Sequence, residues 1–349
     1  MLGVRGRLGV RGRLGAWPAL GIVYVVWGST YLAIKVSLET LPPLLSGAAR
    51  FLAAAAVLGG VIGLVRPRAF RMRRQELATA AVVGLLLILG GNGFVVVAEQ
   101  GISSGLAALL VSTTPLWLVV LRGGTGDRPS RLTVAGVAAG FLGVGVVLLA
   151  GGGPVGGDLP HALLVLGATL CWATGSLLAT RRPMPANPFA ASVVEMASGG
   201  LALLLLGTMA GELGRLDLGA VSGRSWGALA YLVVAGSVVA FSAFVWVLGR
   251  LPVSTVATYA YVNPVIALGL GALLLGEPIG GTVFLGGALI VTAVAVVVTA
   301  EGRQRRATEA TAALGAAGPT PGAVPGGQDS SATDARDPAV TGRGPAAGR

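Results

Sequence analysis

Two charged residues lie inside long apolar stretches of this sequence, where a charge needs a physical reason. The 145 residues that separate Arg50 from Glu195 also separate Trp27 from Trp172, so one pattern occurs twice. A charged side chain at the centre of a bilayer costs about 2.5–3.5 kcal/mol on insertion scales. One interpretation is that both side chains face a common cavity, where Arg50 holds an anionic group and Glu195 a cation or proton. The alternative is that each pairs locally or snorkels toward the membrane surface.

Aromatic and amide side chains recur at helical spacing near these charges. Trp27 and Tyr31 are four residues apart, as are Tyr259 and Asn263, so each pair shares a helix face. Aromatic rings in a cavity can stack on a flat or cationic ligand. The candidate substrate-binding residues are therefore Trp27, Tyr31, Arg50, Trp172, Glu195, Tyr259 and Asn263. The alternative is that the rings only pack between helices or anchor them at the interface.

Two prolines interrupt apolar segments at matching places. Pro115 and Pro264 are 149 residues apart, close to the spacing of the other pairs. Proline lacks a backbone donor and leaves a carbonyl unpaired one turn earlier. Helix discontinuities at corresponding positions of two repeats indicate a binding site near the bilayer midplane. A simple packing kink is the alternative.

The elements that must position these residues are membrane helices. Of 349 residues, 54% are hydrophobic and only 11% are charged, which is far from a soluble composition. A spanning helix needs about 20 apolar residues. Ten stretches meet this requirement: Trp17 to Val36, Leu45 to Val65, Leu77 to Ala98, Gly105 to Leu121, Leu132 to Ala150, Ala162 to Thr180, Pro188 to Ala210, Trp226 to Leu248, Thr255 to Leu275 and Thr282 to Thr299.

The arginines predict how these helices are oriented. They gather in every second loop and at both termini, whereas the intervening loops hold only Arg215 and Arg224, with Lys35 at the end of the first helix. Short loops rich in Lys and Arg stay in the cytoplasm. Both termini are therefore expected in the cytoplasm, and the net charge of +11 requires no nucleic acid partner.

The duplicated pattern predicts four segments. Residues 1–16 form a basic cytoplasmic segment, 17–150 a first repeat of five helices, 162–299 a second such repeat, and 303–349 a disordered cytoplasmic tail. Because five is odd, the second repeat must enter the membrane from the opposite side. The expected fold is an all-α membrane protein of ten transmembrane helices in two inverted five-helix repeats.

Particular motifs resemble the EamA-type domain of the drug/metabolite transporter superfamily. The first helix reads Trp27-Gly-Ser-Thr-Tyr-Leu-Ala-Ile-Lys35 and the second begins Ala48-Ala-Arg50-Phe-Leu. The second copy contains Tyr259-Ala-Tyr-Val-Asn-Pro264 and Gly276-Glu277-Pro278. The first copy matches the latter only by Gly126-Asp127. The resemblance implies a ten-helix exporter of small metabolites or drugs, driven by an ion gradient or by the substrate gradient.

The sequence also contains residues that bear on other classes of protein. Gly101-Ile-Ser103-Ser-Gly105 matches the G-x-S-x-G pattern of serine hydrolases, with His161 as the single histidine, but no orienting carboxylate pattern accompanies it. A phosphate-binding loop and a metal-ligand cluster are absent from the sequence. A non-transporting membrane scaffold remains an alternative.

These features predict a secondary transporter rather than an enzyme. It would lie in the bacterial inner membrane as a multi-pass protein without a cofactor or metal. It would export small metabolites, such as amino acids or related compounds, or drugs by alternating access. A proton is the candidate coupling ion. The substrate's identity and the oligomeric state are not fixed by the sequence.

Overall fold

The computed structural model of the chain is all-helical in the part that it describes. It describes residues 15–124, 126, 129–149, 158–248, 250–251 and 253–316. The predicted basic segment before residue 15, the Asp127 of the first-copy loop and the tail beyond residue 316 lie outside this part. Within it there is no β-strand, as the apolar pattern predicted.

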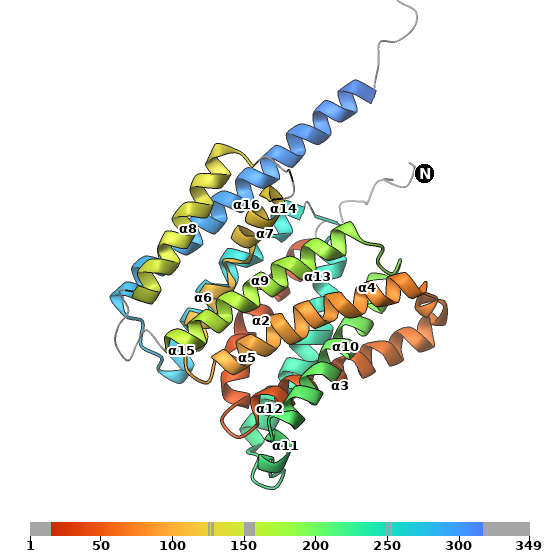
Figure 1. Cartoon of the computed structure of the whole chain (residues 1–349), viewed down its shortest axis with the longest axis vertical. Coiled ribbons are helices and arrows are strands. Elements are labelled where there is room, and N and C mark those ends of the chain that lie inside the picture. Colours follow the sequence, from red (N-terminus) through yellow and green to blue (C-terminus); the bar gives the residue numbers. More distant parts are fainter. Residues whose placement is uncertain are drawn as a thin grey trace, which may run out of the picture. The chain divides into compact units, whose positions relative to one another are not determined.

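The helices follow the predicted spans closely (Figure 1). Their bounds in the first repeat are α2 Ala16–Ser37, α3 Pro43–Val65, η1 Pro67–Phe70, α4 Arg74–Gly84, η2 Leu85–Gly93, α5 Phe94–Ala98, α6 Ser104–Val111, α7 Thr114–Gly123 and α8 Arg131–Leu149. In the second repeat they are α9 Leu159–Arg181, α10 Pro188–Met209, α11 Glu212–Arg215, α12 Gly223–Tyr231, η3 Leu232–Val239, α13 Ala240–Leu248, α14 Val253–Val256, α15 Tyr259–Leu275 and α16 Gly281–Ala316.

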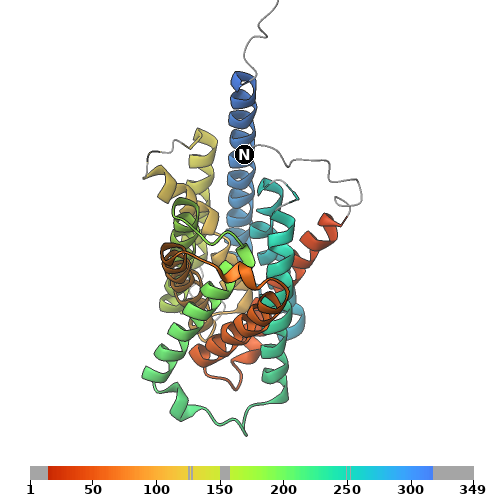
Figure 2. The same ribbon diagram turned by 90° about the vertical axis from the view of Figure 1, so that its right-hand side faces the viewer.

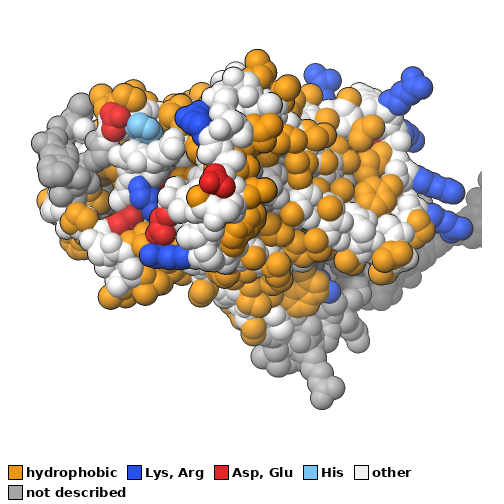
Figure 3. All heavy atoms as spheres, turned by 90° about the horizontal axis from the view of Figure 1, so that it is seen from below, with side chains coloured by type: hydrophobic (Ala, Val, Ile, Leu, Met, Phe, Trp, Pro, Cys, Tyr) orange, Lys and Arg blue, Asp and Glu red, His pale blue; other side chains and the backbone are white. Residues whose placement is uncertain are grey.

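Several of these elements follow one another without a break and together form one membrane span. In the described ranges, nine helical units are long and apolar enough to cross a membrane, and α15 is a shorter apolar helix. The outward side chains are apolar, as lipid contact requires: Leu64 is 88% exposed and Leu273 82% exposed. Figure 3 shows this apolar surface, with basic side chains gathered at its right-hand edge. The chain is therefore an all-α membrane protein with about ten helices and a duplicated repeat.

Helices α3 and α10 pack most closely, and their register shows that they run antiparallel (Figure 1). A Cβ added at Gly59 would lie 3.2 Å from Val193, and one at Gly200 would lie 3.0 Å from Leu52. Small residues at such crossings let two membrane helices approach closely. Because α3 and α10 are the second helices of their repeats, this antiparallel pair is what two oppositely inserted repeats require.

The third span of each repeat contains a π-helical segment, η2 in the first and η3 in the second. Each segment contacts a tryptophan of the opposite repeat. Trp27 donates its indole N–H to the carbonyl oxygen of Gly236 at 3.2 Å, and a Cβ at Gly91 would lie 2.8 Å from the ring of Trp172. Equivalent residues thus meet in both repeats, through a hydrogen bond in one case and through ring packing in the other. Figure 2 shows α12, η3 and α13 running beside α2.

The helix bundle has two chemically different ends. The arginine-rich end contains the connections at residues 66–73, 182–187 and 250–251. The arginine-poor end contains those at residues 38–42, 99–103, 210–222 and 276–280.

The last helix extends beyond residue 303, where the sequence analysis places the start of a disordered tail. Helix α16 continues to Ala316, because alanine, arginine, glutamate and glutamine, which fill this stretch, favour helix. Residues 306–316 of this helix belong to a separate unit from the helix bundle.

Candidate functional site

An aromatic cluster, defined here as Trp27, Phe244 and Tyr259, joins α2 to α13 and α15. The ring centroids of Trp27 lie 5.0 Å from Phe244 and 5.2 Å from Tyr259, and Phe244 lies 5.7 Å from Tyr259. Both contacts of Tyr259 are edge-to-face, a geometry that favours aromatic pairs. The structure therefore brings two of the predicted binding residues together around a third ring that the sequence analysis did not select.

Arg50 is buried beside this cluster, with 7% of its surface exposed. Its Nε donates to the hydroxyl of Ser237 on η3 at 3.0 Å, and its guanidinium carbon lies 4.7 Å from the ring centre of Phe51. Its buried Nη1 has no hydrogen-bond partner. A buried donor without an acceptor is costly, because it has lost water and gained nothing. Arg50 can therefore donate to a further anionic group without breaking an existing bond.

Glu99 is the second buried charged group, and its side chain is fully enclosed just beyond the end of α5. Neither carboxyl oxygen has a hydrogen-bond partner. Lys35 is near, but its ammonium donates to the backbone carbonyls of Glu99 and Ile102, at 2.5 and 2.8 Å. Burial raises the pKa of Glu99 well above its ordinary value. Glu99 is thus placed as a proton acceptor whose protonation state depends on its enclosure.

Tyr31 connects these groups, because it lies close enough to interact electrostatically with Arg50, Glu99 and Tyr259. We call Tyr31, Lys35, Arg50, Glu99 and Ser237 the buried polar cluster. It combines an unpaired donor on Arg50 with unpaired acceptors on Glu99, beside the aromatic cluster. Such a combination suits a small ligand that carries a carboxylate and an apolar or flat part.

Asn263 ties α15 to α2 next to the aromatic cluster. It is buried, and with its amide nitrogen turned toward them it donates to the carbonyls of Tyr259 at 3.3 Å and Tyr24 at 3.2 Å. The hydroxyl of Tyr24 is also hydrogen-bonded to that of Thr258. Asn263 therefore shapes the site by fixing two helices, since its amide donors are occupied.

Two of the predicted binding residues lie elsewhere. Trp172 packs on Gly91 of η2. Glu195 lies where α10 crosses α4, with its backbone carbonyl 2.4 Å from the position of a Cβ on Gly84. The register of α3 and α10 puts Arg50 and Glu195 on opposite sides of the crossing point, so they do not form a pair.

The two predicted helix discontinuities differ in where the proline lies relative to the break in the helix. The first break is a turn at residues 112–113, and Pro115 follows it near the start of α7. The second break is a turn at residues 257–258, whereas Pro264 lies inside α15. The two turns are 145 residues apart, so they match better than the prolines do.

The arginine-poor end is closed by two carboxylates that cap helices of the first repeat. Glu277 accepts hydrogen bonds from the backbone N–H and hydroxyl of Ser104 and from the N–H of Gly105, at 2.8–3.3 Å. Glu212 accepts from the N–H groups of Leu44 and Leu45, at 3.3 and 2.9 Å. A carboxylate at a helix N-terminus pairs with otherwise unused donors and with the helix dipole. These bonds hold the loops of the second repeat onto the first.

The helix crossings at the two ends of the bundle are packed differently. At the arginine-poor end α6 packs against α15, and a Cβ at Gly105 would lie 2.6 Å from Leu268. The equivalent pair at the arginine-rich end is α7 and α14. Among the described residues these two helices form no comparable contact. In the part of the chain that the structure describes, the two repeats are therefore packed unequally at these equivalent crossings.

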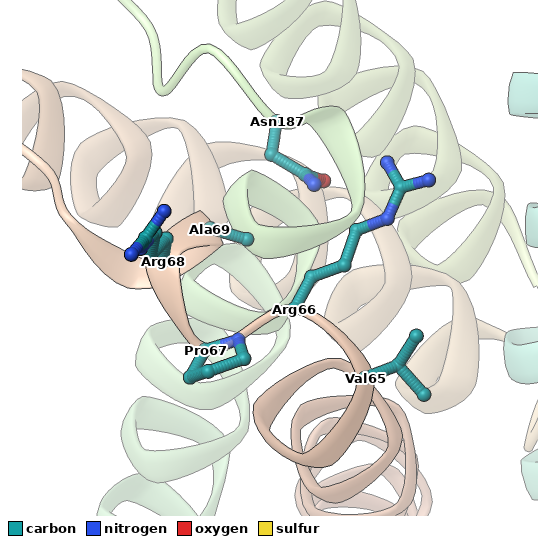
Figure 4. Close-up of a pocket in the computed structure, with 6 residues that line it drawn as sticks. All are labelled: Val65, Arg66, Pro67, Arg68, Ala69 and Asn187. Atoms are coloured by element: carbon teal, nitrogen blue, oxygen red, sulfur yellow. The ribbon is translucent and has the colours of Figure 1, made fainter.

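A separate pocket lies at the arginine-rich end, between α3 and the start of α10 (Figure 4). Val65, Arg66, Pro67, Arg68, Ala69 and Asn187 line it. Asn187 uses its side-chain oxygen to cap α10, accepting from Phe189 and Ala190 at 3.0 and 3.2 Å. The pocket shares no residue with the buried polar cluster.

The residues of the hydrolase alternative have other partners here. The Ser103 hydroxyl accepts from the N–H of Leu106 at 3.2 Å and so caps α6. His161 Nδ1 pairs with Asp158 at 2.9 Å. In the described part of the chain, no hydrogen bond joins Ser103 to His161.

Sequence reasoning missed Glu99, Phe244, Ser237 and the capping role of Glu277. One signal for Glu99 was present, because Lys35 and Glu99 are opposite charges that end two apolar spans on the same predicted side of the membrane. Phe244 stands 145 residues after Glu99, so the two repeats carry different chemistry at this position.

Comparison with known proteins gives consistent results. The model of the EamA-like transporter family matches residues 16–149 and again residues 159–299. The chain is 36% identical over 281 residues to the "Uncharacterized inner membrane transporter YedA" of Escherichia coli strain K12, covering 80% of this chain and 89% of that protein. It is 27% identical to the "Probable amino-acid metabolite efflux pump" of the same strain, covering 78% and 90%. A solved crystal structure has the same fold, with a TM-score of 0.57 at 23% identity, covering 84% of this chain and 99% of that one.

Proposed function

Because the chain belongs to the EamA-like transporter family, whose model matches both halves, we propose that it is a secondary active transporter. It exports small metabolites, such as amino acids or related compounds, or drugs across the bacterial inner membrane by alternating access. The substrate binds between the two repeats, at the aromatic cluster and the buried polar cluster.

The observation that carries this proposal is the unequal closure of two equivalent crossings. Among the residues that the structure describes, helices α6 and α15 are in contact, whereas α7 and α14 form no comparable contact. An alternating-access transporter exchanges two such arrangements around a fixed site. In this state the bonds of Glu277 and Glu212 close the arginine-poor end. Since arginine-rich loops face the cytoplasm, both termini lie inside and the present state is closed toward the periplasm.

The substrate class follows from the chemistry of the site. Arg50 offers an unpaired donor, which suits a carboxylate, and the rings of Trp27 and Tyr259 suit an apolar or flat side chain. The relative named as an amino-acid metabolite efflux pump supports the same class. Glu195 and Trp172 remain proposed contributors in the state that opens toward the other side, where the equivalent crossings exchange their packing.

Efflux from reconstituted vesicles tests this function. Proteoliposomes loaded with radiolabelled amino acids should show saturable efflux. The Arg50→Gln variant should lose most of it, because the neutral amide cannot hold a carboxylate as a guanidinium does. Arg68→Gln, which changes an exposed arginine at the arginine-rich end, is the matched control and should be unaffected. Equal flux in vesicles with and without the protein, for amino acids and for cationic dyes, would contradict the proposal.

A further inference from the structure

Glu99 is the one acidic side chain in the described ranges that is fully enclosed and has no hydrogen bond to either carboxyl oxygen. An ionised carboxylate without donors is far more costly to bury than a neutral carboxyl group. The geometry therefore favours the protonated form of Glu99 in the state described here. Binding of a substrate at Arg50 and the aromatic cluster gives this proton no role, although it lies beside the proposed binding site.

The charged and titratable groups around Glu99 come from every neighbouring element. Helix α2 contributes Lys35 and Tyr31, α3 contributes Arg50, and the α15–α16 loop contributes Glu277. His161 lies in the first turn of α9; its ring abuts Gly101 and is paired with Asp158. Burial is the largest influence on the pKa of Glu99 and raises it; Lys35 and Arg50 lower it, and Glu277 raises it. Because enclosure dominates, opening the structure at this point would lower the pKa.

The bonds that enclose Glu99 are those that close the arginine-poor end. Lys35 is held by the carbonyls of Glu99 and Ile102, and Glu277 holds Ser104 and Gly105. Opening that end must break these bonds, because they tie the 99–105 segment to α2 and to the α15–α16 loop. Water would then reach the Glu99 carboxyl, and the Lys35 ammonium would be released to pair with it. Both changes favour the ionised form.

We propose that Glu99 is the site at which this transporter binds and releases one proton in each transport cycle. The inference rests on the proposed transport function and names its coupling ion. As the arginine-poor end closes around Glu99, an O–H bond of a hydronium ion at that end breaks and an O–H bond forms at a Glu99 carboxyl oxygen. The same bond breaks, returning the proton to water, when Glu99 is opened to the other side. Arg50 and Tyr31 link this proton to the substrate, because they interact with Glu99 within one cluster.

Infrared difference spectroscopy of the purified protein tests the proton site without any substrate. The wild-type protein should show the carbonyl-stretching band of a protonated carboxyl at neutral pH, and Glu99→Gln should remove it. Glu39→Gln, at an exposed ion pair with Arg224, is the control and should retain it. Loss of the band in Glu195→Gln, with retention in Glu99→Gln, would overturn the assignment.

A second variant keeps the test decisive if Glu99→Gln does not fold. Lys35→Gln removes a positive charge that favours the ionised carboxylate, while its amide can still donate to the two carbonyls. The midpoint of the infrared titration should therefore move to higher pH. A midpoint that stays in place or moves to lower pH would count against Glu99 as the titrating group.

Transport measurements separate this inference from the proposed function. In Glu99→Gln vesicles, exchange of labelled for unlabelled amino acids should persist, while an imposed pH gradient should no longer drive accumulation. If the gradient still drives accumulation, the proton site is wrong and the transport function stands. If the wild-type protein moves no amino acid or dye but the infrared band depends on Glu99, the transport function and its coupling to a proton both fail, and Glu99 stands only as an enclosed, protonated carboxyl group.

Discussion

Trp27 donates its indole N–H to the carbonyl oxygen of Gly236, 3.2 Å away in the π-helical segment of the other repeat. A π-helical turn shifts the backbone hydrogen bonds away from the usual α-helical pattern, and this bond gives the Gly236 carbonyl a side-chain donor inside the membrane. It also fixes the Trp27 ring against Phe244 and Tyr259. The proposed binding site and the contact between the repeats therefore depend on the same side chain.

Trp27→Phe tests this double role. The substitution keeps an aromatic ring but removes the N–H donor, so the carbonyl of Gly236 loses its partner. Aromatic contacts and single hydrogen bonds are each worth about 0.5–1.5 kcal/mol. We expect the KM for efflux to rise about three- to tenfold, with a small fall in thermal stability. Trp17→Phe, at an exposed position on the same helix, should leave both unchanged. An unaltered KM in Trp27→Phe would remove this ring from the site.

Glu277→Gln should favour opening of the arginine-poor end. Hydrogen bonds to a charged acceptor contribute about 1.5–3 kcal/mol, and the neutral amide weakens all three bonds to Ser104 and Gly105. Ile102→Cys, placed at a buried residue after replacement of Cys171 by alanine, reports the opening. Its labelling by a membrane-impermeant maleimide should rise about tenfold in the Glu277→Gln background.

The control for this experiment is Glu39→Gln, which changes an exposed carboxylate in a weak ion pair at the same end. It should leave labelling unchanged. Equal labelling in the Glu277→Gln and parent proteins would mean that Glu277 caps α6 without holding the end closed.

Gly84→Ala should destabilise the contact between α4 and α10. A Cβ at this position would lie 2.4 Å from the carbonyl oxygen and 2.6 Å from the Cα of Glu195, and neither backbone atom can move away easily. Overpacking of this kind costs about 1–3 kcal/mol, which thermal unfolding in detergent would detect as a lower Tm. At Gly60 on α3 nothing lies within 4 Å, so Gly60→Ala should keep or slightly raise the Tm. Similar Tm values for both variants would contradict the close crossing.

The stability of the protein should fall as the pH rises above the ordinary range of a glutamic acid. The pKa of Glu99 is raised in the folded state, so between its unfolded and folded pKa values the folded state binds more protons than the unfolded state. The free energy of unfolding therefore decreases with increasing pH across that window. Tm measured from about pH 5 to pH 8 should decline in the wild type, and the decline should be smaller in Glu99→Gln. A slope that Glu99→Gln leaves unchanged would assign it to other groups.

Much of the architecture could be predicted from the sequence, because membrane helices are specified locally. Apolar length defined the spans, and the spacing of Trp27 from Trp172 identified the duplication. An odd number of spans per repeat then predicted opposite insertion, and the antiparallel register of α3 and α10 agrees with it. The sequence also placed Trp27, Arg50, Tyr259 and Asn263 among the candidate residues, and the structure gathers these on neighbouring helices.

Only the tertiary structure decided which side chains meet and which end is closed. Arg50 and Glu195 occupy equivalent positions of the two repeats. Arg50 belongs to the buried polar cluster, whereas Glu195 lies at another helix crossing. The sequence places Glu99 in a loop after an apolar span. In the structure it is enclosed, because Lys35 and Glu277 hold the adjoining segment in place. The physical reason is that the two repeats are similar in sequence, so close packing at either of the two equivalent crossings has a similar free energy. Local sequence cannot distinguish these packings, because the difference lies in contacts between residues far apart along the chain.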